Sequence, residues 1–185
     1  MERELTLVEL YEKGGGGVYP TDKEDNHKYL STYERLFSPF RYKDVNIFEI
    51  GYFYGGSCKL WEDYFPNAQI KAIDITNKYR EELPVKLSSR TTLDIKDATT
   101  LTREYFSDFP PDIIIDDASH LITDHIITIP ILYDVLRPDG IFIIEDVMDI
   151  KRYPKVFGRF GIQTEIVDLR DMSGVWDSVL IIARK

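Results

Sequence analysis

The chain has 185 residues, 43% of them hydrophobic, a single cysteine (Cys58) and a formal net charge of −9. This length suits one domain, one cysteine excludes an internal disulfide and a cysteine-rich zinc site, and the acidic balance disfavours binding to nucleic acid. Because its first residues lack the layout of a signal peptide and no apolar run approaches the ~18 residues that span a bilayer, we expect a reduced, cytoplasmic protein without a membrane partner.

Residues 1–44 differ in composition from the rest of the chain. They contain four consecutive glycines, Gly14–Gly17, then the motif Tyr19-Pro20-Thr21-Asp22-Lys23, and we expect a helix over about residues 26–37. Four glycines hold one conformation only at a high entropic cost, so this stretch is interpreted as a flexible loop, hinge or lid, with a plain linker as the alternative.

From residue 45 onward, short apolar runs rich in β-branched residues alternate with segments of helical period, which is typical of a parallel sheet covered by helices. We expect strands at residues 45–50, 69–75, 91–95, 112–116, 140–145, 163–169 and 178–183. The clearest helices are 56–64, with Leu60, Trp61 and Tyr64 on one apolar stripe, and 120–136.

The last two strands are joined by a segment too short for a crossover helix, so they should pair antiparallel. The expected fold is therefore α/β: a seven-stranded, mostly parallel sheet with a terminal antiparallel hairpin and helices on both faces. Residues 1–185 form one domain, in which an N-terminal segment (1–44) precedes the core (45–185).

Acidic residues follow five consecutive strands. They are Glu49, Asp74, Asp97, the pair Asp116-Asp117 and the pair Glu145-Asp146. An aspartate after a strand is ordinarily a helix N-cap, and each acid taken singly fits that interpretation. Because ligands of open α/β sheets bind at the carboxyl ends of the strands, five in succession favour a binding edge.

The turn after the first strand reads Glu49-Ile-Gly51-Tyr-Phe53-Tyr-Gly55-Gly56-Ser57. Phe53 stands where the dinucleotide fingerprint has the glycine that admits a pyrophosphate, so NAD is disfavoured. Asp74 follows Gly51 by close to the ~20 residues expected for a ribose-binding acid. A cofactor with a ribose and a sulfonium, S-adenosylmethionine (SAM), fits both features; tight packing of strand on helix is the alternative.

Asp117, Glu145 and Asp146 form a second acidic group. Two carboxylates about 5 Å apart repel by roughly 3 kcal/mol at an effective dielectric of 20, so three converging acids need protons or a cation. Oxygen ligands select Mg²⁺, or else Mn²⁺ or Ca²⁺. The alternative is that one acid turns inward to cap a helix or to pair with a lysine or arginine.

Three histidines are available for acid–base chemistry. His120 follows Asp117 at the expected start of a helix, where a neutral imidazole could act as a general base. The alternative for His120 is a surface position or one behind the site. His125 is interpreted as structural, and His27 has no assignment.

Several separate motifs, in chain order, resemble the class I SAM-dependent methyltransferases of the macrolide-sugar O-methyltransferase type (mycinamicin VI and demethylmacrocin). They are Tyr19–Lys23, Phe48–Ser57 with Leu60-Trp61 and Tyr64–Ala68, Ile73–Ile75, Ile115–His120 and Ile144–Asp146, so that the resemblance extends over about residues 18–185. It implies a Rossmann-like class I methyltransferase fold.

The resemblance also implies the site residues. Mg²⁺ would bind Asp117, Glu145 and Asp146, and His120 would be the base. SAM would be held by Thr21, Lys23, Glu49, Gly51, Gly55, Ser57, Asp74, Ile75, Asp97, Ala98 and Asp116. For Lys23, a solvated surface charge is the alternative. Ala118 replaces the glycine usual in the metal loop, and the auxiliary N-terminal domain of those enzymes is not represented in this sequence, which leaves the acceptor and any homo-oligomer open.

The function expected is Mg²⁺-assisted transfer of methyl from SAM to a hydroxyl of a sugar or sugar-like small molecule. Methylation of a catechol or an N-acceptor is one alternative. A catalytically silent SAM-binding module is the other, and it would bind the cofactor without needing a divalent ion.

Overall fold

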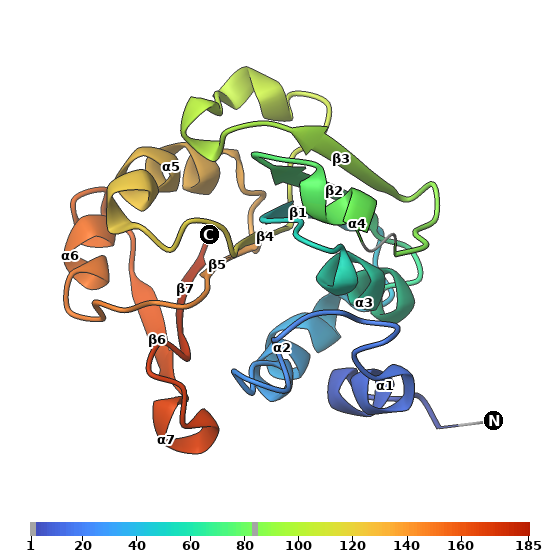
Figure 1. The fold of residues 1–185 in the computed structure, drawn as a ribbon. Coiled ribbons are helices and arrows are strands. Elements are labelled where there is room, and N and C mark those ends of the chain that lie inside the picture. The colour runs from blue at the N-terminus through green and yellow to red at the C-terminus, as the bar shows by residue number, and fades with distance from the viewer. Residues whose placement is uncertain (1–2, 83–84) are drawn as a thin grey trace.

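A computed structural model describes residues 3–82 and 85–185 (Figure 1). Met1 and Glu2, which begin the segment where no signal peptide is expected, and residues 83–84 lie outside the described residues. The helices are α1 (Leu7–Gly14), α2 (Leu30–Phe37), α3 (Gly56–Tyr64), α4 (Lys78–Glu82), α5 (Ile122–Val135), α6 (Tyr153–Gly158) and α7 (Arg170–Ser173), with short 3₁₀ turns at Ser38–Phe40, Ala98–Thr100 and Arg103–Phe106.

Seven strands form one sheet in the order β3-β2-β1-β4-β5-β7-β6. Their bounds are β1 (Asn46–Ile50), β2 (Gln69–Asp74), β3 (Thr91–Ile95), β4 (Ile113–Asp116), β5 (Ile141–Ile144), β6 (Thr164–Asp168) and β7 (Val179–Arg184). The first five are parallel, and β7 pairs antiparallel with both β5 and β6. The predicted fold class is confirmed.

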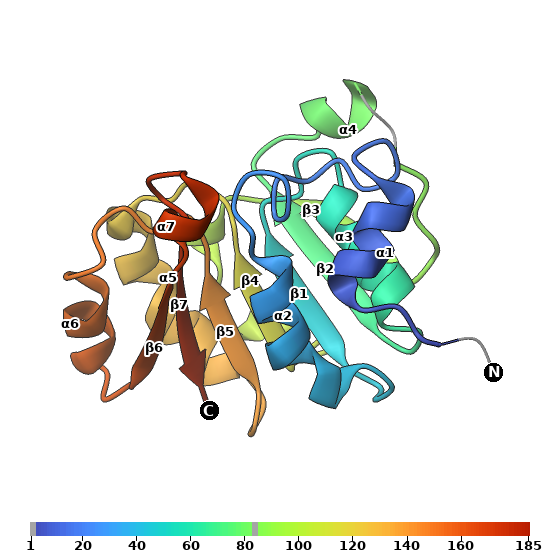
Figure 2. The same ribbon diagram turned by 90° about the horizontal axis from the view of Figure 1, so that it is seen from below.

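Helices cover both faces of the sheet, as Figures 1 and 2 show. Successive residues of a strand point to opposite faces, so Ile47 packs with α1, α2 and α3 whereas Phe48 packs with α5 and α6. Burial on both faces explains why the central strands are continuously apolar, as in Ile113-Ile114-Ile115.

The predicted α3 has the bounds expected, and its Leu60, Trp61 and Tyr64 are fully buried. The predicted helix 120–136 instead begins at Ile122, because His120 has a left-handed backbone (φ 54°) that a helix does not accept. The predicted helix from residue 26 begins at Leu30, since Lys28 is also left-handed (φ 61°).

Helix α1 was not expected, although its start can be recognised in the sequence. Thr6 and Glu9 form a capping box, each side chain accepting from the other's backbone N–H. The glycine run closes this helix: Gly14 is its last residue, and Gly15 (φ 64°) donates to the Tyr11 carbonyl. A lid function for this run stays a prediction. None of the described helices has both the length and the apolar character needed to cross a bilayer.

The turn after β1 packs directly on the loop after β4. Gly51 has φ 97°, and a Cβ there would lie 2.0 Å from the backbone oxygen of Asp117. Only glycine permits both this backbone and this approach, so Gly51 fixes the position of the loop that carries Asp117.

We expect Gly51→Ala to destabilise the protein more than Gly161→Ala. Gly161 also has a positive φ, 71°, but open space around its Cβ position. Its substitution should therefore lower the free energy of unfolding only by the strain of a left-handed alanine, about 1–2 kcal/mol. At Gly51 the clash should add about 1–3 kcal/mol. Urea denaturation measures both variants, and equal losses would contradict the close approach.

Candidate active site

A cavity of about 720 Å³ lies at the carboxyl ends of the five parallel strands. Its lining includes these residues expected to bind cofactor: Gly51, Asp74, Ile75, Asp97, Ala98 and Asp116. It also includes Asp117, His120 and Asp146, together with Phe53, Tyr79, Lys96 and Thr99, which sequence reasoning did not assign. One cavity therefore joins the expected nucleoside-binding residues to most of the expected metal and catalytic residues.

A smaller cavity of about 340 Å³ adjoins the first and shares Asp22, Gly51, Phe53 and Asp117 with it. Thr21 and Ser57, both expected to bind cofactor, line this second cavity. The N-terminal segment thus forms one wall of the site. Lys23, Glu49, Gly55 and Glu145 line neither cavity.

Asp74 at the end of β2 fixes the glycine turn. One carboxylate oxygen accepts from the backbone N–H groups of Tyr52 and Phe53, both at 3.0 Å, and the other accepts from Thr76 N–H at 3.1 Å. Asp97 behaves similarly after β3, where hydrogen bonds from the Thr99 hydroxyl and N–H, both 2.8 Å, lower its pKa. Both acids are held in place at the cavity wall by backbone donors.

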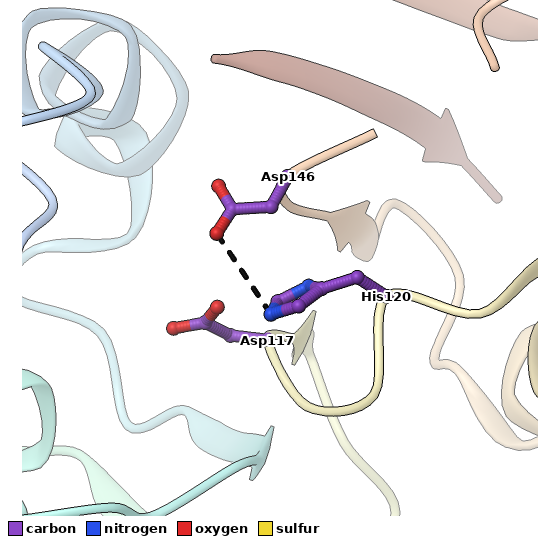
Figure 3. A group of neighbouring side chains, drawn as sticks. All are labelled: Asp117, His120 and Asp146. Carbon is purple, nitrogen blue, oxygen red and sulfur yellow. Dashed lines mark ion pairs between the residues drawn. The ribbon is translucent and has the colours of Figure 1, made fainter. Parts of the chain in front are cut away.

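Asp117, His120 and Asp146 lie close together in the loops that follow β4 and β5 (Figure 3). One potential ligand atom from each lies within 4.8 Å of the others, and His120 Nε2 is 3.8 Å from Asp146 Oδ2. His120 Nδ1 is buried without a hydrogen-bond partner. Two carboxylates beside an imidazole fit Mg²⁺, which needs only one or two carboxylates and completes its shell with water and substrate oxygens.

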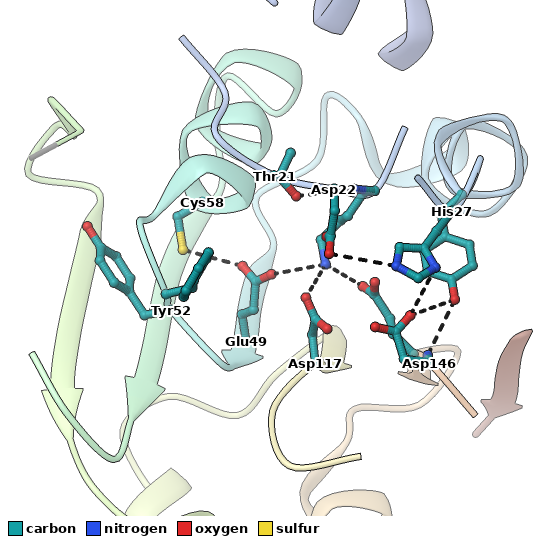
Figure 4. Close-up of polar contacts among 12 residues, drawn as sticks. Thr21, Asp22, His27, Glu49, Tyr52, Cys58, Asp117 and Asp146 are labelled. Carbon is teal, nitrogen blue, oxygen red and sulfur yellow. Dashed lines mark hydrogen bonds and ion pairs between the residues drawn. The ribbon is translucent and has the colours of Figure 1, made fainter. Parts of the chain in front are cut away.

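Lys23 is fully buried, so the interpretation as a solvated surface charge is wrong. Its ammonium lies 2.6 Å from Asp117 Oδ2, 2.7 Å from Glu145 Oε1 and 3.9 Å from Glu49 Oε1 (Figure 4). Burial disfavours the charge, but these three carboxylates outweigh it and raise the pKa of Lys23 well above its ordinary value. Lys23 is thus a buried cation within an acidic cluster.

Glu145 turns inward, which the sequence left open for one of the three acids. Its Oε1 accepts hydrogen bonds from both the Lys23 ammonium and the Tyr33 hydroxyl. Glu145 is 1% exposed. Burial is the largest cause that raises the pKa of Glu145, and repulsion from the Asp117 carboxylate is the second. Removing one partner of such a buried pair typically costs about 3–5 kcal/mol.

Residues 27–33 support the site in a way that sequence reasoning missed. Tyr29 donates to Asp146 Oδ1 at 2.8 Å, and His27 Nδ1 lies 2.9 Å from Ser178 Oγ and 3.5 Å from Asp146 Oδ1. The sequence did offer one signal for these contacts. Tyr29 and Tyr33 are four residues apart, so they lie on the same face of a helix and can direct their hydroxyls toward neighbouring acids.

Glu49 lies below the glycine turn. Its Oε2 accepts from Trp61 Nε1 at 3.1 Å and from the Cys58 thiol at 3.3 Å, while Oε1 has no hydrogen bond. Burial raises the pKa of Glu49. Cys58 is therefore a hydrogen-bond partner of this acid. His125 is buried with Nδ1 2.6 Å from the Tyr153 hydroxyl and also lines the large cavity, so its interpretation as structural stays a prediction.

The chain is similar in sequence and in structure to several known methyltransferases. The chain is 34% identical over 134 residues to 8-demethyl-8-alpha-L-rhamnosyl tetracenomycin-C 2'-O-methyltransferase of Streptomyces olivaceus, which covers 68% of this chain and 35% of that protein. It is 31% identical to mycinamicin VI 2''-O-methyltransferase of Micromonospora griseorubida over 65% of this chain and 31% of that protein. The chain thus spans about a third of the length of these relatives.

The structure of MycE methyltransferase from the mycinamycin biosynthetic pathway, in complex with Mg and SAH, superposes with a TM-score of 0.64. That match has 27% sequence identity and covers 83% of this chain and 40% of the other. No protein-family model matches the chain. The resemblance indicated by the sequence motifs is nevertheless confirmed: the chain has the Rossmann-like fold of the class I methyltransferases and is a relative of the macrolide-sugar O-methyltransferases.

Proposed function

We propose that this chain transfers a methyl group from SAM to a hydroxyl of a sugar or sugar-like small molecule, assisted by Mg²⁺. The observation that carries the proposal is that one cavity is lined both by Asp74 and Asp97 and by Asp117, His120 and Asp146. The named relatives are O-methyltransferases of a rhamnosyl tetracenomycin and of mycinamicin VI, and the MycE structure holds Mg and SAH.

The cavity walls suggest how the cofactor lies. Asp74 would accept the ribose hydroxyls, with Ile75, Asp97, Ala98 and Asp116 around the adenine. Thr21, Gly51 and Ser57, on the smaller cavity, would receive the amino-acid end. Gly55 would shape the glycine turn through its left-handed backbone, and Glu49 would anchor the turn to α3 through Cys58 and Trp61. Lys23 contacts acids instead of either cavity, so we assign it no contact with SAM.

The chain's own groups then define the chemistry. Asp117 and Asp146 would hold the ion, which when bound lowers the pKa of a coordinated hydroxyl. His120 Nε2 would take the hydroxyl proton, and Asp146 Oδ2, 3.8 Å away, would stabilise the resulting imidazolium. SAM, when bound, would supply the methyl group: the acceptor oxygen would bond to the methyl carbon as the carbon–sulfur bond breaks, and S-adenosylhomocysteine would be the leaving group.

Calorimetry with S-adenosylhomocysteine, with and without Mg²⁺, tests the cofactor site. We expect binding in the wild type and in Asp117→Asn, because Asp117 serves the ion and the acceptor. Methyl transfer to a sugar panel should be lost in Asp117→Asn and retained in Asp139→Asn, a control in an exposed turn. Absence of binding at millimolar concentration would contradict the proposal. Cofactor binding without any dependence of transfer on the ion would favour the alternative acceptors, and binding without transfer would favour a silent module.

His120→Asn tests the general base. Asparagine tolerates the left-handed φ of 54° at this position, so the fold should persist. Loss of a general base typically lowers the rate about 10²–10⁴-fold, and we expect kcat to fall in that range while the affinity for S-adenosylhomocysteine stays unchanged. A kcat near that of the wild type would remove His120 from this role.

A further inference from the structure

We propose that Phe53 is a specificity-determining residue of this site: its aromatic ring recognises the positively charged sulfonium of SAM and so favours SAM over the product, S-adenosylhomocysteine, whose sulfur is neutral. The inference rests on the proposed function, because it concerns the cofactor of the same site. It gives a role to a side chain that the sequence motif marked only as unsuited to a pyrophosphate.

Phe53 lies where the two cavities meet. It lines both of them, and the other residues common to the two are Asp22, Gly51 and Asp117. The proposed function places the ribose beside Asp74 in the large cavity and the amino-acid end in the small one. Because the sulfonium sulfur is bonded to both of these parts of SAM, it would lie at this junction. Of the four residues that the cavities share, Phe53 alone has an aromatic ring.

The turn after β1 holds this ring in place. Phe53 has a left-handed backbone (φ 47°), which is uncommon for a bulky residue and persists where the surrounding structure holds it. Here the Phe53 N–H donates to Asp74 Oδ2 at 3.0 Å, so the acid proposed to accept the ribose hydroxyls also fixes the turn. The ring packs against Tyr54 and Tyr79, with centroid separations of 4.0 Å and 4.7 Å. Phe53 is nevertheless 50% exposed, so a ring of fixed position remains open to a ligand.

The surroundings of the ring favour a cation. The face of an aromatic ring carries partial negative charge and attracts a cation that lies within about 6 Å of its centroid. The junction also carries the carboxylates of Asp22 and Asp117. In the same aromatic cluster, the Lys78 ammonium already lies 5.6 Å from the centroid of the Tyr79 ring. Since S-adenosylhomocysteine has no charge on sulfur, the Phe53 ring should distinguish the two forms of the cofactor.

Isothermal titration calorimetry of the full chain with SAM and with S-adenosylhomocysteine measures the two affinities separately. Phe53→Leu removes the aromatic face but keeps an apolar side chain. We expect it to weaken SAM binding about three- to tenfold, whereas S-adenosylhomocysteine binding should change less than about twofold. Phe53→Tyr keeps the ring and should retain the wild-type ratio of the two dissociation constants.

Ile75→Ala is the matched control. Ile75 lines the large cavity but not the small one, so its apolar side chain lies on the nucleoside side, away from the junction. Its truncation should change the affinities for SAM and S-adenosylhomocysteine by the same factor. An equal loss of both affinities in Phe53→Leu would overturn the inference, because apolar packing alone would then explain what the ring contributes.

Fluorinated phenylalanines incorporated at position 53 decide the question even if Phe53→Leu does not fold, as circular dichroism would show. Fluorine weakens the negative face of the ring with little change of shape, so the preference for SAM should fall with each added fluorine. A constant preference would overturn the inference. A wild-type chain that binds neither ligand contradicts the proposed function itself, whereas binding of both with a ratio insensitive to position 53 contradicts this inference alone.

Discussion

Repulsion among the carboxylates that end β1, β4 and β5 is the constraint on which the rest of this site depends. The parallel pairing of β1 with β4 and of β4 with β5 brings these strand ends to one edge, and removing such charges from water is costly unless each finds a partner. Lys23 supplies the partner for Glu145 and one oxygen of Asp117. What remains exposed to the cavity is a smaller, better-defined acidic group beside His120.

The N-terminal segment is consequently part of the site rather than an appendage to the core. It contributes the buried ammonium, the tyrosine hydroxyls on Asp146 and Glu145, and one wall of the smaller cavity. The same segment covers one face of the sheet through α1 and α2. Packing and site electrostatics are therefore coupled, and a change that loosens α2 should also disturb the acids.

Much of the fold follows from local patterns in the sequence. The strand positions, the antiparallel hairpin and α3 follow from β-branched apolar runs and an apolar stripe, and the gathering of acids at one edge follows from the parallel sheet. Helix α1 was missed although its capping box is a local signal. The start of α5 was misplaced because nothing local announces the left-handed backbone of His120.

The site was less predictable, because its decisive contacts join distant residues. Lys23 and Glu145 are 122 positions apart, and nothing in the sequence around either residue indicates that the two form an ion pair. A lysine in a polar motif is ordinarily exposed, so only the folded chain shows that this one is buried. The sequence could indicate that one of three acids turns inward, but not that Glu145 is the one.

The most direct measurement of the central claim is the anomalous difference density of Mn²⁺ in crystals grown with S-adenosylhomocysteine. We expect one peak at the ends of β4 and β5, bounded by the carboxylates of Asp117 and Asp146 beside His120. A crystal that holds S-adenosylhomocysteine but shows no peak at these residues would contradict the proposed metal site.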